Sequence, residues 1–143
     1  MILKQIKNED LRGLCDLYDD LIGRKTNYQK LLEAFEKISS SDNYYILGAF
    51  KDNELVGSVM GIVCQDIVGD CRPFMVIENV VVASRVRREG IGKELMITIE
   101  KIAKERDCYY MIFVSGDQRK EAHVFYEKLG FKDEKVQGYR KHF

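Results

Sequence analysis

The sequence predicts an α/β protein, in the sense of an α+β mixed sheet with helices packed on both faces. Three observations predict it. The first is an apolar strand pattern that runs into a glycine turn and a helix, at residues 74–103. The second is a pair of strand patterns at residues 44–63, which resembles a hairpin. The third is that apolar residues recur at helical spacing both before and after these segments. The predicted order is β-α-α-β-β-β-α-β-α-β-β, in a single domain that covers residues 1–143.

The first third of the chain reads as a short strand followed by two amphipathic helices. Residues 2–6 are a strand candidate, and Asn8 can cap a helix that ends at Gly23. Thr26 and Gln29 stand in capping-box spacing before the second helix. The apolar face of that helix consists of Tyr28, Leu31, Leu32, Phe35 and Ile38.

Three strands are predicted next, and the third leads into the central turn. Segments 44–50 and 55–63 are strand-like and flank the polar turn 51–54. Pro73 can stand at the entrance to the following strand, 74–82, whose β-branched composition suits a strand buried on both faces. Apolar residues then recur at helical spacing, namely Ile91, Leu95, Ile99, Ile102 and Ala103.

The C-terminal part predicts one more strand, one helix and two terminal strands. The apolar run 109–114 suits a buried strand, and Asp117 can cap a helix that stops at Gly130. Segments 131–132 and 139–143 are the terminal strand candidates. The helix has an apolar face formed by Ala122, Phe125, Tyr126 and Leu129.

The glycine turn between the central strand and its helix has the chemistry of an anion site. A helix N-terminus leaves backbone N–H groups without partners, and the helix dipole adds partial positive charge there. Gly90 and Gly92 remove side chains that would keep a ligand from the backbone, while Arg87, Arg88 and Lys93 add full charges. The turn therefore suits a phosphate or a pyrophosphate.

Two common phosphate-binding patterns do not fit this turn, and a third does. A P-loop needs Ser or Thr where Glu94 stands, and a dinucleotide fingerprint needs Gly or Ala where Leu95 stands. The pattern Arg-x-x-Gly-x-Gly at 87–92, after a valine strand, resembles the acyl-CoA signature of the GNAT superfamily of N-acetyltransferases. Residues 122–131, Ala-His-Val-Phe-Tyr-Glu-Lys-Leu-Gly-Phe, are similar to that family's Ala-x-x-Phe-Tyr-Glu-x-x-Gly-Phe element.

The resemblance covers essentially the whole chain and implies an N-acetyltransferase that uses acetyl-CoA as co-substrate. It implies that the glycine turn binds the CoA pyrophosphate, and that the pantetheine arm lies beside the 74–82 strand, where that strand splays from the 109–114 strand. It also implies that Tyr126 faces the CoA sulfur, where a phenol can protonate the departing thiolate; the alternative is a packing residue only. The residues expected to bind the donor are Val80, Val81, Val82, Arg87, Arg88, Glu89, Gly90, Ile91, Gly92 and Lys93.

The acceptor side has two candidate residues in the central strand. Glu78 is the only acid in that strand, where burial would be costly for an unpaired carboxylate, so it is a candidate base for the amine. An acid hydrogen-bonded to a neighbouring strand or loop is an equal alternative. Asn79 is expected to face the other way and is a candidate for positioning substrate. Ser115 and Cys108 have no base at readable spacing, which favours direct attack in a ternary complex.

His123 lies within the second motif, and Arg119 lies three residues before the motif begins. His123 lies three residues before Tyr126 and invites a general-base interpretation, but a structural role is favoured because the family pattern assigns it no chemistry. Arg119 stands where many relatives carry Asn three residues before the alanine of the motif. The donor contact expected from that Asn is missing, although an Arg can reach a CoA phosphate instead.

Composition limits the function classes. The chain is 45% hydrophobic and 32% charged, and its formal net charge of zero argues against a dedicated binder of nucleic acid or of anionic membranes. It has no bilayer-length apolar stretch and no signal-peptide core, which predicts a cytoplasmic location. The four cysteines lack Cys-x-x-Cys spacing and there are two histidines, so reduced thiols and no metal site are expected.

The expected partner is a small-molecule or peptide amine acceptor. The resemblance also allows a homodimer, because members of the family commonly pair through edge strands. A non-catalytic acyl-CoA sensor of the same fold is the alternative to an enzyme. The intact anion turn and the tyrosine at 126 favour the enzyme.

Overall fold

The structure is a computed structural model that describes residues 1–115 and 120–143. Contacts divide the chain into two compact units, residues 1–112 and residues 113–143. The first unit holds a five-stranded mixed sheet with three α-helices, and the second holds α4 (Lys120–Lys128). No helix in the described part of the chain has the length and apolarity that crossing a membrane requires.

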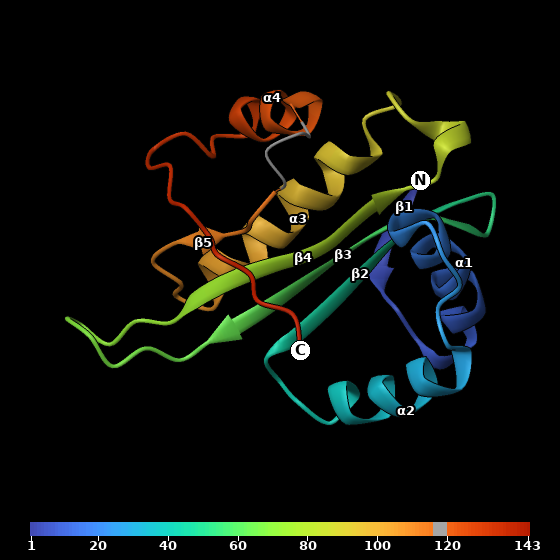
Figure 1. The fold of residues 1–143 in the computed structure, drawn as a ribbon, viewed down its shortest axis with the longest axis horizontal. Helices are drawn as coiled ribbons and strands as arrows, with labels where there is room; N and C mark the ends of the chain where they lie inside the picture. Colours follow the sequence, from blue (N-terminus) through green and yellow to red (C-terminus); the bar gives the residue numbers. More distant parts are fainter. Residues whose placement is uncertain (116–119) are drawn as a thin grey trace. The chain divides into compact units, whose positions relative to one another are not determined.

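The strands of the first unit lie in the sheet in sequence order (Figure 1). The first four pair antiparallel with their neighbours, whereas the fifth runs parallel to the fourth. A parallel pair needs a crossover connection, and α3 provides it. The strands are β1 (Ile2–Gln5), β2 (Tyr44–Lys51), β3 (Glu54–Cys64), β4 (Phe74–Val82) and β5 (Met111–Ile112).

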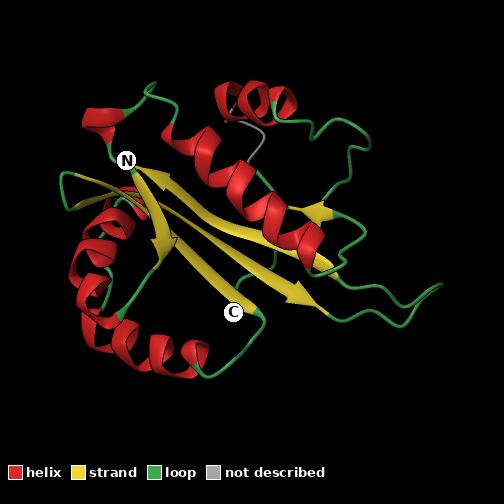
Figure 2. Ribbon diagram, turned by 180° about the vertical axis from the view of Figure 1, so that it is seen from behind, coloured by secondary structure: helices red, strands yellow, loops and turns green. Residues whose placement is uncertain are grey.

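Helices cover both faces of this sheet, as predicted. The elements are η1 (Asn8–Asp10), α1 (Leu11–Ile22), α2 (Tyr28–Ser39), η2 (Ser84–Val86) and α3 (Ile91–Glu105). Seen from behind, α3 lies across the strands (Figure 2). Two glycines of β3 permit this close packing. A Cβ at Gly57 would lie 3.0 Å from the Ile91 side chain, and one at Gly61 would lie 2.9 Å from the Ile99 side chain.

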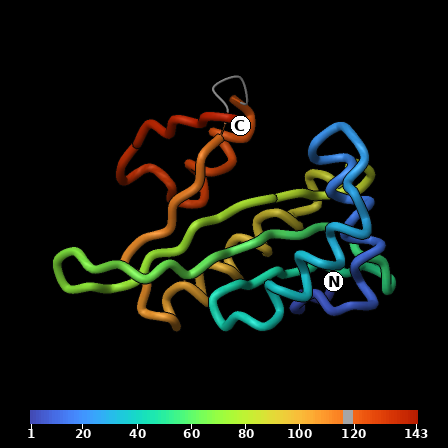
Figure 3. The backbone as a smooth tube through the Cα atoms, turned by 60° about the horizontal axis from the view of Figure 1, so that its bottom comes forward, coloured from blue at the N-terminus to red at the C-terminus, as the bar shows by residue number. Residues whose placement is uncertain are grey.

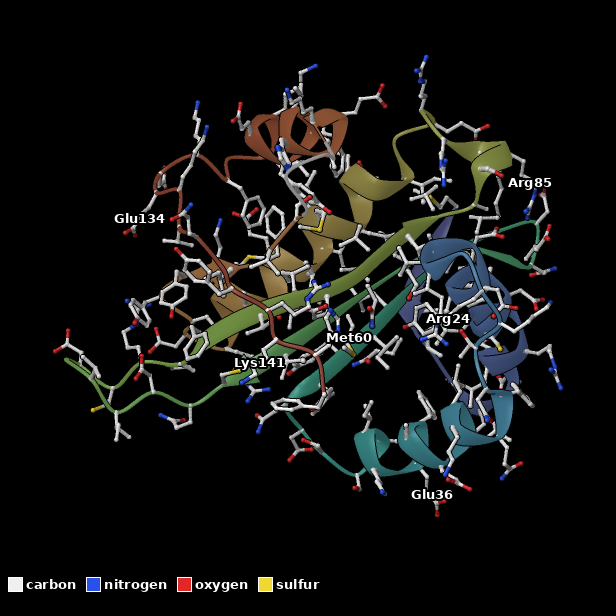
Figure 4. All side chains as sticks on the ribbon, in the orientation of Figure 1. Arg24, Glu36, Met60, Arg85, Glu134 and Lys141 are labelled. Atoms are coloured by element: carbon white, nitrogen blue, oxygen red, sulfur yellow. The ribbon has the colours of Figure 1, made fainter. Side chains whose placement is uncertain are left out.

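The opposite face carries a second hydrophobic cluster under α1 and α2. Its buried members come from α1, from β2 and from the β1–η1 connection, namely Ile6, Leu11, Leu14, Ile46 and Phe50. Tyr18 and Tyr28 pack against this cluster from the helices, and Met60 packs against it from β3 (Figure 4). Met60 therefore marks the α1 face of the sheet.

The helix boundaries follow the predicted signals with small shifts. Gly23 ends α1 in the left-handed conformation, with φ 70°, and its N–H donates to the Asp19 carbonyl. The cap of α2 is Asn27, whose side chain accepts from the Lys30 N–H at 3.0 Å, rather than the predicted Thr26. The helix predicted from residue 9 begins as the 3₁₀ turn η1 and continues as α1.

The prediction of two terminal strands is wrong. Residues 131–143 form no strand, and the predicted 109–114 strand is reduced to the two residues of β5. Charged side chains dominate this terminal segment, and Val136 is its only β-branched residue, so the segment has little strand propensity. The predicted Asp117 cap of α4 lies outside the described residues.

The connection between β3 and β4, residues 65–73, projects from one end of the sheet (Figure 3). Asp66 shapes its start by accepting from the N–H groups of Ile67 and Val68. Pro73 stands at the entrance to β4, as predicted, and all four cysteines are free thiols.

Candidate functional site

One edge of β4 is open along most of its length within residues 1–112. β4 pairs with β5 only at Met75–Met111 and Val76–Ile112. From Ile77 to Val82 that edge has no paired strand in this unit, although β3 covers the other edge. The splay predicted between the 74–82 and 109–114 strands stays a prediction. An extended ligand with amide groups could bind the open edge by adding to the ladder.

A β-bulge interrupts β4 at Asn79. Glu78 pairs with Met60 and Val81 with Ser58, so two residues of β4 stand opposite the single residue Val59 of β3. Asn79 has a φ of 55°, in the left-handed region, which asparagine tolerates better than most residues. The bulge therefore bends β4 just before its valine end.

The bulge turns Glu78 and Asn79 to the same face of the sheet. Residues paired directly across antiparallel strands project to the same side, so Glu78 shares the α1 face with Met60. Asn79 also meets α1, through Tyr18. The prediction that Asn79 faces away from Glu78 is therefore wrong, because the left-handed residue breaks the alternation of the strand.

The prediction of a strand buried on both faces is wrong as well. Met75, Ile77 and Val81 are buried, whereas Glu78 is exposed. The carboxylate therefore carries no burial cost, and the argument from a costly buried acid no longer applies. Exposure leaves Glu78 in reach of water and of a soluble amine.

Tyr18 is a polar member of this site that the sequence did not reveal. Its half-buried side chain lies among the core residues of α1. Burial raises the pKa of the Tyr18 hydroxyl to about 12, and hydrogen bonding with Asn79 and Ser58 opposes that rise. One feature of the sequence could have pointed to Tyr18, namely a phenol on an otherwise apolar helix face. A buried tyrosine hydroxyl usually finds a hydrogen-bond partner, so such a residue often lies next to other polar groups.

The glycine turn follows β4 through η2 and leads directly into α3. Gly90 is the N-cap of α3, with φ 84°, and no side chain caps the helix. The backbone N–H groups of Ile91, Gly92 and Lys93 therefore begin the helix without intrahelical partners. Open space surrounds the position that a Cβ at Gly90 would take. The predicted strand, turn and helix are confirmed in this order.

The charged side chains of the turn differ in their contacts. The Arg87 Nε donates to the Val82 carbonyl at 3.4 Å, which ties the turn to the end of β4. The Glu89 carboxylate pairs with Lys51 at 2.8 Å, so its charge is balanced, and this contact raises the pKa of Lys51. Arg88 and Lys93 are exposed. Positive charge is therefore available beside the uncapped helix end.

Arg85 in η2 adds one more ion pair next to the turn. Its guanidinium contacts the Glu54 carboxylate at 2.7 Å, at the start of β3 (Figure 4). This contact and the Lys51–Glu89 pair both link the turn region to the β2–β3 hairpin. Both pairs are substantially exposed, so their role is one of orientation more than of stability.

The second unit carries the second motif. Tyr126 lies in α4 and its ring packs against Phe113, with centroids 3.9 Å apart. Phe113 also meets Phe131 edge-on, at 4.8 Å between centroids. His123 is half-buried, one turn before Tyr126. Arg119 lies outside the described residues. The donor-side role predicted for Tyr126 stays a prediction.

Comparison with known proteins gives three informative likenesses. The Drosophila melanogaster protein named "Probable glucosamine 6-phosphate N-acetyltransferase" is 27% identical over 136 residues, which are 92% of this chain and 60% of that protein. The chain thus spans less than two thirds of that relative. The crystal structure of glucosamine-6-phosphate N-acetyltransferase from Arabidopsis thaliana has a TM-score of 0.84 at 24% identity, covering 98% of this chain and 97% of that one.

The third likeness is a crystal structure of a transcriptional regulator from Bacillus halodurans, with a TM-score of 0.88 and 25% identity over 99% of both chains. The family model described as "Acetyltransferase (GNAT) family" matches residues 11–131, from the first residue of α1 to just beyond α4. This span includes the bulged strand, the glycine turn and the second motif. The chain belongs to the GNAT acetyltransferase family.

Proposed function

We propose that this chain transfers the acetyl group of acetyl-CoA to a primary amine by direct attack in a ternary complex. One observation carries the proposal: the open edge of β4 is followed, after η2 and the glycine turn, by a helix that starts after Gly90 without a side-chain cap. An extended amide-bearing arm with a pyrophosphate at its end matches these two features in the same order. The GNAT family membership supports the same donor.

The donor would be held mainly by backbone groups. The pantetheine amides would pair with the β4 edge near Val80, Val81 and Val82, and the pyrophosphate would accept from the first N–H groups of α3. Arg88 and Lys93 would add charge beside the phosphates. The Glu89–Lys51 pair supports this arrangement, because it keeps the Glu89 carboxylate from opposing the anion.

In the reaction, the amine nitrogen would attack the thioester carbonyl carbon, and the carbon–sulfur bond would break as the amide forms. The proton lost by the amine would pass to Glu78, through water where the carboxylate does not reach it directly. Asn79 would help to position the amine. The departing thiolate would take its proton from Tyr126.

Gly92→Ala is expected to weaken acetyl-CoA binding by about tenfold or more, because a methyl group would displace the pyrophosphate from charge-assisted backbone hydrogen bonds. Alanine suits a helical position, so the melting temperature should not fall. Gly90 is a poorer choice, since its φ of 84° strains any other residue. Calorimetric titration is the measurement.

Gly13→Ala is the matched control for Gly92→Ala. Gly13 lies in α1, and a Cβ there would meet Leu55 at an ordinary 3.5 Å. This variant should bind acetyl-CoA as the unchanged protein does. Equal affinity in the Gly92→Ala variant would move the phosphate site away from the turn.

The acceptor is tested by incubating the protein with acetyl-CoA and a panel of amines while free thiol is measured. Relatives named as glucosamine 6-phosphate N-acetyltransferases support that amino sugar phosphate as the first acceptor. Glucosamine, a polyamine and a peptide with a free N-terminus complete the panel. We expect amine-dependent thiol release. Binding of acetyl-CoA without thiol release for any amine would favour the acyl-CoA sensor, with which the name of the Bacillus halodurans protein agrees.

A further inference from the structure

The α1 face of the sheet is apolar around Glu78 and only partly covered. Residues paired directly across antiparallel strands project to the same side, so three cross-strand rows can be placed on this face. The rows are Ile46–Met60–Glu78, Tyr44–Ile62–Val76 and Cys64–Phe74. Apart from Ile46, which is buried, their apolar members are half-buried. Apolar surface of β3 and β4 therefore remains partly exposed next to the proposed base.

The opposite face of the same two strands shows that such exposure is not general in this sheet. Val59 and Val63 of β3 are 0% and 6% exposed, and Met75 and Ile77 of β4 are 0% and 2% exposed. On that side α3 lies across the strands (Figure 2). An apolar surface that stays partly open beside a fully packed one is typical of a binding site.

An aromatic pair lies at the end of β4 away from the glycine turn. The ring of Phe74 stacks on the ring of Tyr110, with centroids 5.2 Å apart and planes inclined by 20°, and Tyr110 is 39% exposed. Glu78, Val76 and Phe74 alternate along β4, so Glu78 stands about 13 Å from Phe74 along the strand. We call the surface formed by Met60, Ile62, Val76, Phe74 and Tyr110 the apolar strip. It has a carboxylate at one end and two aromatic rings at the other.

The charges on this face indicate the kind of ligand that would suit it. Glu78 is exposed and forms no ion pair within residues 1–115 and 120–143. The three rows contain no basic residue. An aliphatic amine is mostly protonated at neutral pH, so its charge would be attracted to the carboxylate. An anionic group on the same molecule would meet no cation from these strands and would lose its hydration on the strip.

We propose that the acceptor is a primary amine carried on an apolar chain without an anionic group, and that this chain lies on the apolar strip, from Glu78 toward Phe74 and Tyr110. The inference rests on the proposed function, since it seats the amine beside the base. Each methylene group of the chain that leaves water would stabilise the complex. Glucosamine 6-phosphate would instead place hydroxyl groups and a phosphate on this surface, so we expect it to be the poorer acceptor.

The test compares butylamine, hexylamine and octylamine with glucosamine 6-phosphate as acceptors. We expect kcat/KM to rise by about threefold for each methylene group added between butylamine and octylamine. Octylamine should exceed glucosamine 6-phosphate in kcat/KM by about tenfold or more. A kcat/KM that does not depend on chain length, or a higher value for glucosamine 6-phosphate, would overturn the proposal.

Val76→Thr tests where the chain lies. Threonine keeps the β-branched shape that suits a strand, but it places a hydroxyl in the middle of the apolar strip, about 7 Å along β4 from Glu78. We expect kcat/KM for octylamine to fall by about fivefold and that for butylamine to fall less, because its chain is too short to cover Val76. Val68→Thr is the matched control, since Val68 is 74% exposed in the 65–73 connection and lies outside the strip. An equal octylamine value in Val76→Thr and Val68→Thr would contradict the proposal.

A nuclear magnetic resonance titration tests the strip without catalysis. Octylamine is added to the protein in the presence of CoA, which carries no acetyl group to transfer. The methyl signals of Met60, Ile62 and Val76 should shift, whereas those of Val59 and Met75, on the α3 side, should not. Unchanged signals from the strip would overturn the inference even if the protein acetylates other amines. Shifted signals in a protein that acetylates no amine would support the binding site and count against the proposed function alone.

Discussion

Replacing Glu78 with glutamine is expected to lower turnover with an amine acceptor by about 10²- to 10⁴-fold near neutral pH, and by much less at alkaline pH. An aliphatic amine has a pKa of about 10, so nearly all of it is protonated at neutral pH and must lose a proton before it attacks. The exposed Glu78 carboxylate is accessible to water and can receive that proton. Above the pKa of the amine, the free base dominates and the carboxylate becomes dispensable.

The measurement is a pH profile of turnover for the unchanged protein, for Glu78→Gln and for a control, Glu36→Gln. Glu36 is exposed on α2 and points away from the sheet, so its loss should leave the profile unchanged (Figure 4). Circular dichroism would confirm that the variants fold alike. A loss of equal size at every pH would contradict the base role and would make Glu78 a group that orients the substrate.

The strand, turn and helix at the centre of the chain could be predicted because local signals determine them. The β-branched run 74–82 became β4, and the helical spacing from Ile91 became α3. Gly90 lies at the position where the chain needs a positive φ before the helix. Each of these features depends on residues close together in sequence, and the periodicity of apolar residues predicts such local structure well.

The acceptor side could not be predicted in the same way. A single left-handed residue at Asn79 shifts the register of β4 against β3, and the periodicity of apolar residues in the sequence does not predict that shift. The error about Asn79 followed from this shift, because strict alternation was assumed, whereas the error about Glu78 came from assuming burial on both faces of the whole strand. The sequence does not single out Tyr18, because the polar residues near its hydroxyl lie on β3 and β4, far away in sequence.

The C-terminal segment shows a different limit. Segments 131–132 and 139–143 were predicted as strands, but charged side chains lie within and between them, and no strand forms. The role of Tyr126 depends on how its helix meets the donor, a long-range relation that local patterns do not encode. Family resemblance supplies that expectation, and a substitution can test it.

Tyr126→Phe is expected to reduce turnover by about 10²-fold, the low end of general acid catalysis, while the acetyl-CoA affinity stays within about twofold. The hydroxyl would act on the sulfur only as negative charge develops there, so it contributes to the transition state and hardly to donor binding. Water can replace part of its effect, and a thiol with a pKa of about 8.5 is a fair leaving group without help. The change keeps the ring against Phe113, so the melting temperature should not move.

Tyr139→Phe is the matched control for Tyr126→Phe. The Tyr139 side chain is 90% exposed and its hydroxyl donates to the Gln137 side chain at 3.1 Å, so the control removes a phenol hydroxyl from the same unit without touching the aromatic cluster. Steady-state turnover, calorimetric affinity for acetyl-CoA and thermal melting are measured for both variants. Full activity in Tyr126→Phe would leave Tyr126 as a packing residue beside Phe113. A large loss of acetyl-CoA affinity would point to a donor-binding hydroxyl, because a group that acts only in the transition state cannot weaken the ground-state complex.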